Sequence, residues 1–177
     1  MPDYRRYRVP GGTYFFTVAL AERGSDLLVR EVDRLRDAAR VTQAARPFAI
    51  RAGVVMPDHL HCVWTLPEGD ADYSGRWGAI KARFSMSMRR AGFTPPDPVG
   101  VENGGVNPAL RRKGEIGLWQ PRFWERTVRG EEELAAYVRY VWMNPVKHGF
   151  VARPVDWPWS SFHRAVRHGK VSEDWGG

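Results

Sequence analysis

Two histidines in one short segment are the first residues whose types and spacing could do chemistry. His59 and His61 lie within VVMPDHLHCVWTLP, residues 54–67, which otherwise has the pattern of a buried strand. Side chains alternate in a strand, so both imidazoles point to one face while Leu60 and Cys62 point to the other. Burying two imidazoles without partners is costly. The spacing therefore favours a divalent metal site over a pair of ordinary half-buried histidines.

The composition suits a compact protein that would carry this site. The chain has 177 residues, 43% hydrophobic and 12% aromatic, so we expect a single domain over 1–177. No apolar run of about 18 residues is present, and the N-terminus lacks the apolar middle of a signal peptide. We therefore expect a cytoplasmic protein without membrane association. The single cysteine, Cys62, has no partner for a disulfide or a cysteine-type zinc site, so any metal must use nitrogen and oxygen ligands.

The charge of the chain predicts a polyanionic partner. Lysine and arginine number 27 against 20 acidic residues, a formal net charge of +7. This balance favours nucleic acid. Most of the cations are arginines, which bind phosphate bidentately, although a genome rich in arginine codons would give the same count. The segment YRRYRV, residues 4–9, mixes arginine with aromatic residues, a combination that suits single-stranded nucleic acid because bases can stack on it.

Hydrophobic periodicity and turn residues predict the order of elements. Strands are expected at 13–20, 47–56, 59–66 and 122–128, and amphipathic helices at 28–45 and 74–90. A third helix begins near Gly130 and is expected to end at Asn144, because proline disfavours helical geometry in the residue before it. Three segments flank these elements: a basic leader (1–12), a long proline-rich and glycine-rich loop (91–117) and a tail (151–177). The loop carries a basic tract at 111–113 that favours contact with nucleic acid.

The third helix carries a candidate nucleophile. Tyr140 and Asn144 are four residues apart, so they lie within about 40° of each other and one turn apart. Tyr137 lies on the same stripe but about 10 Å along the axis from Asn144, which is too far to share a small site. Tyr140 is therefore the better candidate.

Five motifs together resemble a known family. The order of elements is similar to that of the HUH single-tyrosine transposases. The segments YRRYRVPGGTYFFTV, VVMPDHLHCVWTLPEGD, WQPRFWE, YVWMNPVKHGFV and DWPWSSFHR resemble its REP-associated tyrosine transposase branch. The match spans most of the chain and departs from the family at 91–117, which resembles an insertion.

The resemblance implies both a fold and a reaction. The fold is an α/β (α+β) HUH endonuclease fold, a ferredoxin-like antiparallel sheet with helices on one face. His59, His61 and Asn144 are implied as metal ligands and Tyr140 as the nucleophile. The implied enzyme is a transposase that cleaves and rejoins hairpin-containing, REP-like single-stranded DNA through a 5′-phosphotyrosine intermediate. We expect Mg²⁺ or Mn²⁺ as the cofactor, with zinc able to occupy the site in vitro.

Further residues are expected to contact the DNA, and no obligate protein partner is inferred. His148 is also a candidate acid or base, whereas His163 and His168 are expected to be phosphate contacts or surface residues. The predicted nucleic-acid contacts are Arg5, Arg6, Arg8, Gly11, Gly12, Lys81, Arg122, Lys147 and His148.

Two other functions are compatible with the same features. A ferredoxin-like sheet with exposed aromatics also binds single-stranded RNA in RRM-type modules, so a binding protein without catalysis would have similar charge and fold. A metal nuclease that uses water would keep the histidine pair but would not depend on Tyr140. A covalent bond to Tyr140 is expected of the transposase alone.

Overall fold

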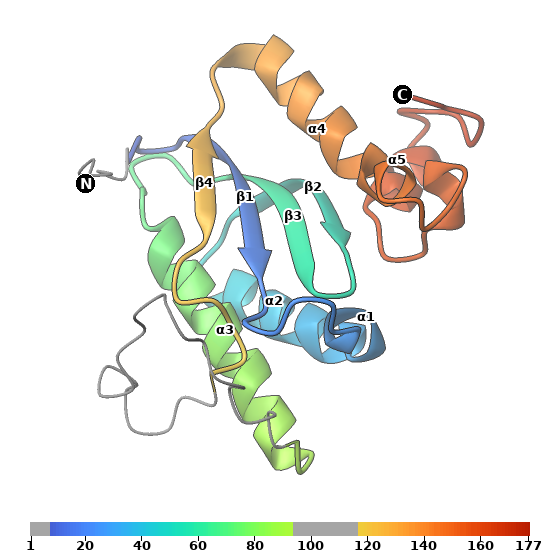
Figure 1. Cartoon of the computed structure of the whole chain (residues 1–177). Coiled ribbons are helices and arrows are strands. Elements are labelled where there is room, and N and C mark those ends of the chain that lie inside the picture. The colour runs from blue at the N-terminus through green and yellow to red at the C-terminus, as the bar shows by residue number, and fades with distance from the viewer. Residues whose placement is uncertain (1–7, 94–116) are drawn as a thin grey trace, which may run out of the picture.

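A computed structural model describes residues 8–93 and 117–177 of the chain (Figure 1). Arg5, Arg6 and the tract 111–113 lie outside the described residues. The elements are, in chain order, β1 (Thr13–Ala19), α1 (Leu27–Arg30), α2 (Val32–Ala45), β2 (Ala49–Val55), β3 (His59–Thr65), α3 (Tyr73–Arg90), β4 (Trp124–Thr127), α4 (Gly130–Lys147), the 3₁₀ turn η2 (Pro154–Asp156) and α5 (Phe162–Arg167).

The four strands form one antiparallel sheet in the order β2-β3-β1-β4. The chain order strand, helix, two strands, helix, strand with this arrangement is the ferredoxin-like topology. The predicted α+β class and antiparallel sheet are therefore confirmed. Thr17 at the centre of β1 is paired with His61 on β3 and with Trp124 on β4, so these three residues form one row across the sheet.

Two hydrophobic cores cover the two faces of the sheet. One core joins Phe16 and Cys62 of the sheet to α1, α2 and α3. The other joins Phe15 and Val63 to α4, α5 and the C-terminal segment. Helices therefore lie on both faces rather than on one, and in Figure 1 the sheet stands between α4 and the α2–α3 pair. The alternation along β3 decides which residues face α4, and the histidines are among them.

Two helix boundaries differ from the sequence prediction. The helix expected over 28–45 is divided at Glu31 into α1 and α2. The helix expected to end at Asn144 continues through Pro145 to Lys147. Pro145 is buried, so tertiary packing outweighs the local preference against helix before a proline. The extra turn brings Lys147 and His148 to the face that holds the histidine pair.

The segment after residue 150 folds back onto the edge of the sheet. Ser160 forms an isolated bridge with Val54 of β2, and the Ser161 hydroxyl accepts hydrogen bonds from Gly53 N and Trp142 Nε1, both at 2.9 Å. Phe162 of α5 is fully buried. The predicted tail is thus an integral part of the second core. No helix within the described residues is long and apolar enough to cross a membrane.

Candidate active site

His59 and His61 lie side by side on β3 and face α4. Their ring centroids are 4.9 Å apart and both side chains are buried. The opposite face of the same strand sends Leu60 and Cys62 into the core against α2 and α3. The sequence prediction of two imidazoles on one face is therefore confirmed.

Each histidine is held through its Nδ1 atom. His59 Nδ1 lies 2.6 Å from Asp58 Oδ1, and His61 Nδ1 lies 2.8 Å from Thr17 Oγ1. A carboxylate can only accept, so His59 Nδ1–H donates to Asp58 and the lone pair of the neutral ring is at Nε2. The same tautomer of His61 arises when Nδ1–H donates to Thr17. Such partners orient metal-binding imidazoles and fix their tautomer.

Asp58 and Thr17 are positioning residues that the sequence reasoning missed. In the sequence, Pro57 and Asp58 lie between the strands expected at 47–56 and 59–66 and are typical of a turn, although a carboxylate directly before a histidine strand also suggests the contact. It is fixed by the backbone N–H of Gly24 at 2.7 Å and by Arg23 at 3.2 Å. Thr17 is separated from His61 by 44 residues, and only the strand register identifies it.

Burial keeps both imidazoles neutral. Burial lowers the pKa of His61 to about 3, with smaller contributions from neighbouring positive groups. Burial also lowers the pKa of His59, against the opposing effect of Asp58. Burial alone would raise the pKa of Asp58, but the bonds from His59 and Gly24 and the charge of Arg23 lower it overall. Near neutral pH the site therefore presents two uncharged nitrogen donors backed by one carboxylate, the protonation states that metal binding requires.

One stripe of α4 faces the histidine pair. The Tyr140 ring centroid lies 5.3 Å from that of His61, and the His148 ring centroid lies 5.7 Å from that of His59. Asn144 lies between them at the same four-residue spacing, so its side chain belongs to the stripe that faces the pair. The structure thus brings the predicted residues Tyr140, His59 and His61 together by ring contacts, and helix spacing places Asn144 on the same stripe of α4.

Asn144 is suited to be a third ligand. Its side chain is 0% exposed, and neither Oδ1 nor Nδ2 has a hydrogen-bond partner. Buried amides in native proteins are nearly always satisfied, so an unsatisfied one on the stripe that faces two histidines fits the role of a ligand. Two imidazoles and an amide oxygen fit a divalent cation. Within the described residues no three His, Cys, Asp or Glu side chains are grouped so that they could hold a metal ion.

The surroundings of Tyr140 differ from those of Tyr137. The Lys147 ammonium lies 5.2 Å from the centroid of the Tyr140 ring, and the Tyr140 side chain is 38% exposed. Tyr137 instead stacks on Phe15, with ring centroids 4.6 Å apart, and burial raises the pKa of its phenol. Tyr140 therefore combines access to a substrate with contact to the histidine pair.

The other predicted DNA contacts are dispersed. Arg8 and Arg122 are exposed. Gly11 has φ +68°, its N–H donates to the Asp70 carbonyl, and a side chain at Gly12 would meet the Val9 carbonyl, so both glycines are required by the turn itself. Lys81 lies on α3, which packs on the face of the sheet opposite the histidines, and its ammonium donates to the Gln120 carbonyl at 2.9 Å.

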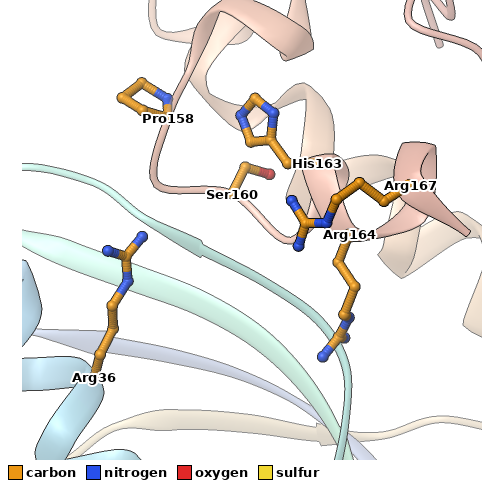
Figure 2. A pocket seen from close by; sticks show the side chains of 6 residues that line it. All are labelled: Arg36, Pro158, Ser160, His163, Arg164 and Arg167. Atoms are coloured by element: carbon orange, nitrogen blue, oxygen red, sulfur yellow. The ribbon is translucent and has the colours of Figure 1, made fainter.

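A basic depression of about 370 Å³ lies away from the histidine pair, between α2 and α5 (Figure 2). Several of its polar side chains already have partners within the protein. Arg164 donates to the Ile50 carbonyl at 2.6 Å, His163 Nε2 lies 2.8 Å from the Trp157 carbonyl, and Arg36 pairs with Asp33. His163 is therefore a structural residue at the rim of this depression.

The chain is similar over its whole length to two named relatives and one solved structure. It is 43% identical over 177 residues to REP-associated tyrosine transposase of Escherichia coli (strain K12), covering 100% of this chain and 92% of the relative. It is 37% identical over 177 residues to a putative REP-associated tyrosine transposase of Haemophilus influenzae, covering 100% of this chain and 94% of the relative. A solved structure of a REP-associated tyrosine transposase bound to a REP hairpin matches with a TM-score of 0.82 and 42% identity, covering 100% and 92%. No protein-family model matches.

Proposed function

The chain belongs to the REP-associated tyrosine transposases, and from that premise we propose that it cleaves and rejoins hairpin-containing single-stranded DNA at Tyr140. The membership confirms the family resemblance and makes the chain a transposase, an enzyme. The relative bound to a REP hairpin supports hairpin DNA as the partner. The cytoplasm, where DNA is available, stays the predicted location.

The contact between Tyr140 and His61, at 5.3 Å between ring centroids, is the observation that carries the proposed chemistry. The Tyr140 hydroxyl oxygen attacks the phosphorus, the new bond joins this oxygen to the 5′-phosphate, and the bond to the 3′-oxygen breaks. The phenol loses one proton and the departing 3′-hydroxyl gains one. Because the phosphodiester energy is conserved in the 5′-phosphotyrosine, the strand can be rejoined by the reverse reaction.

The histidine pair and Asn144 are proposed to hold the divalent cation. Mg²⁺ or Mn²⁺ bound there would polarise the phosphate and stabilise the charge that develops on it. Neutral ligands leave the full charge of the ion facing the substrate. Asp58 and Thr17 hold the two imidazoles, and Lys147 places a positive charge beside the attacking phenol.

The test is covalent capture on labelled hairpin DNA with a single-stranded extension, in the presence of Mg²⁺ or Mn²⁺. Wild type is expected to form an adduct that survives denaturation. Tyr140→Phe keeps the ring and removes the attacking oxygen, so adduct and cleavage should both vanish while DNA binding persists. Tyr137→Phe is the matched control and should remain active. His59→Ala should abolish cleavage with little loss of affinity, since phosphate contacts elsewhere dominate binding.

Each alternative has its own outcome in this experiment. Cutting by Tyr140→Phe would identify water as the nucleophile and the chain as a metal nuclease. Loss of activity in Tyr137→Phe alone would transfer the role to Tyr137. Absence of both adduct and cleavage in wild type with either metal would leave a DNA-binding protein without this chemistry.

The basic leader is proposed to contact the DNA near the hairpin. Changing Arg5, Arg6 and Arg8 to alanine should weaken hairpin binding and reduce its dependence on salt, because fewer counterions are released. Fluorescence anisotropy at several salt concentrations measures both quantities. Equal affinity and an equal salt slope would show that the leader does not touch DNA.

A further inference from the structure

Exposed aromatic side chains gather on the face that holds the histidine pair. Within residues 8–93 and 117–177, the exposed large hydrophobic side chains are Val41, Met86, Trp124, Tyr140 and Phe150. Val41 and Met86 belong to α2 and α3, which pack on the opposite face of the sheet. The three aromatic members all lie around the proposed active site. Among the described residues, exposed aromatic side chains are therefore concentrated on the face of the proposed active site.

Trp124 stands at the β4 end of the site. Directly paired residues of antiparallel strands share a face, and Thr17 is paired with both Trp124 and His61. Two strand spacings put Trp124 about 10 Å from His61. Trp124 is 50% exposed, and its ring makes an edge contact with Phe15, at 5.6 Å between centroids. The Trp124 indole is therefore accessible to a ligand bound at the proposed active site.

Phe150 stands at the opposite end. It follows α4, its side chain is 49% exposed, and its ring centroid lies 6.4 Å from that of His148. Neighbouring centroids 4.9 to 6.4 Å apart connect the two ends in a continuous series of rings: Trp124, Phe15, His61, His59, His148 and Phe150. The proposed metal ligands lie in the middle of this series.

We propose that Trp124 and Phe150 are stacking platforms for two bases of single-stranded DNA, one on each side of the phosphodiester that Tyr140 attacks. This inference rests on the proposed function. Exposed aromatic rings beside a basic surface bind single strands because every base has a face that can stack. A base within a duplex has no free face, so the platforms would hold only the unpaired strand. The net charge of +7 favours nucleic acid over an apolar protein segment.

The platforms can be tested without cleavage. In a Tyr140→Phe background, the affinity for a DNA hairpin with a single-stranded extension is measured by fluorescence anisotropy. An abasic residue is placed in turn at each position of the extension. Trp124→Ala should weaken binding by about 5-fold to 150-fold, the range found for aromatics that stack on a base. Phe150→Ala should do the same.

Combining each alanine variant with each abasic position identifies the base that stacks on each aromatic ring. At one position of the extension, an abasic residue should lower the DNA affinity of the Tyr140→Phe protein as much as Trp124→Ala does, and should lower it no further once Trp124→Ala is present. A second position should show the same relation to Phe150→Ala. Trp124→Phe should retain most of the affinity, and Met86→Ala, an exposed apolar control on α3, should retain all of it. Losses that add at every position, or equal losses on a hairpin without the extension, would overturn the proposal. Because the background variant does not cut, failure of the Tyr140 chemistry would be seen separately, in the adduct assay.

Discussion

Replacing Asp58 with asparagine tests whether the carboxylate behind His59 tunes metal binding. The substitution preserves shape and still lets His59 Nδ1–H donate, but the acceptor becomes neutral. Charge-assisted hydrogen bonds are roughly twice as strong as neutral ones. Removing a carboxylate partner of a metal-binding histidine typically lowers metal affinity by about 10-fold to 100-fold, which corresponds to about 1.4 to 2.8 kcal/mol.

The effect on folding should be small by comparison. Arg23 pairs with Asp58 at 3.2 Å, but its side chain is mostly in solvent, and exposed ion pairs contribute about 1 kcal/mol or less. Asparagine has one side-chain oxygen, which keeps the bond from His59, and the N–H of exposed Gly24 can bond to water instead. The expected result is therefore a shift in metal dependence in a protein that remains folded.

The assay is the rate of adduct formation on hairpin DNA as a function of Mn²⁺ concentration. Asp58→Asn should need about 10-fold to 100-fold more Mn²⁺ for half of the maximal rate, and saturating metal should restore most of that rate. Asp33→Asn, which alters an exposed pair with Arg36 on α2, is the control and should not shift the curve. An unchanged curve for Asp58→Asn would refute the reasoning and reduce Asp58 to a loop contact.

Three further predictions follow from buried polar groups. Asn144→Leu should abolish adduct formation yet leave the metal-free protein as stable or more stable in urea unfolding, because an unsatisfied buried amide is removed; a large loss of stability would contradict this. His61, with a folded-state pKa of about 3, must gain a proton on unfolding below about pH 6.5, so the stability of the metal-free protein should fall as pH decreases by up to about 1.4 kcal/mol per pH unit, and His61→Gln should flatten that slope between pH 6 and 4. Arg76→Met should cost about 1.5 to 3 kcal/mol in the same measurement. Buried Arg76 donates to both Asp70 oxygens and to three backbone carbonyls, but the Asp70 carboxylate is partly exposed and stays solvated. A cost below about 1 kcal/mol would show that these bonds are replaced by water.

The histidine pair was predictable because the signal is local. A period of two over a short apolar segment determines which side chains share a face, and β3 keeps that pattern from His59 to Thr65. The spacing of Tyr140 and Asn144 on a helix is equally local. What the sequence pattern could not provide is the distance between strand and helix, which depends on packing between residues some 80 positions apart in the chain. The family resemblance supplied that part.

The sequence pattern did not identify Asp58, Thr17 or Trp124 as residues of the site, and the physical reasons differ. Asp58 follows a proline, and the turn preference of that pair hid its role as the acceptor for His59. Thr17 and Trp124 depend on register, and a strand paired one residue differently would turn both to the other face. The separation of helices onto two faces also follows from packing rather than from the periodicity of any single element.

The end of α4, where the predicted helix boundary was wrong, lies at the proposed active site. A proline inside a helix costs about 3 kcal/mol, and an unsatisfied buried amide adds a further cost. Pro145 carries the first of these costs and the neighbouring Asn144 carries the second. Had the helix ended at Asn144 as the local rule predicts, His148 would not reach His59 and Lys147 would not lie over Tyr140. Two adjacent violations of local preference at the stripe that faces the histidines are expected where chemistry, and not stability, determines the residues.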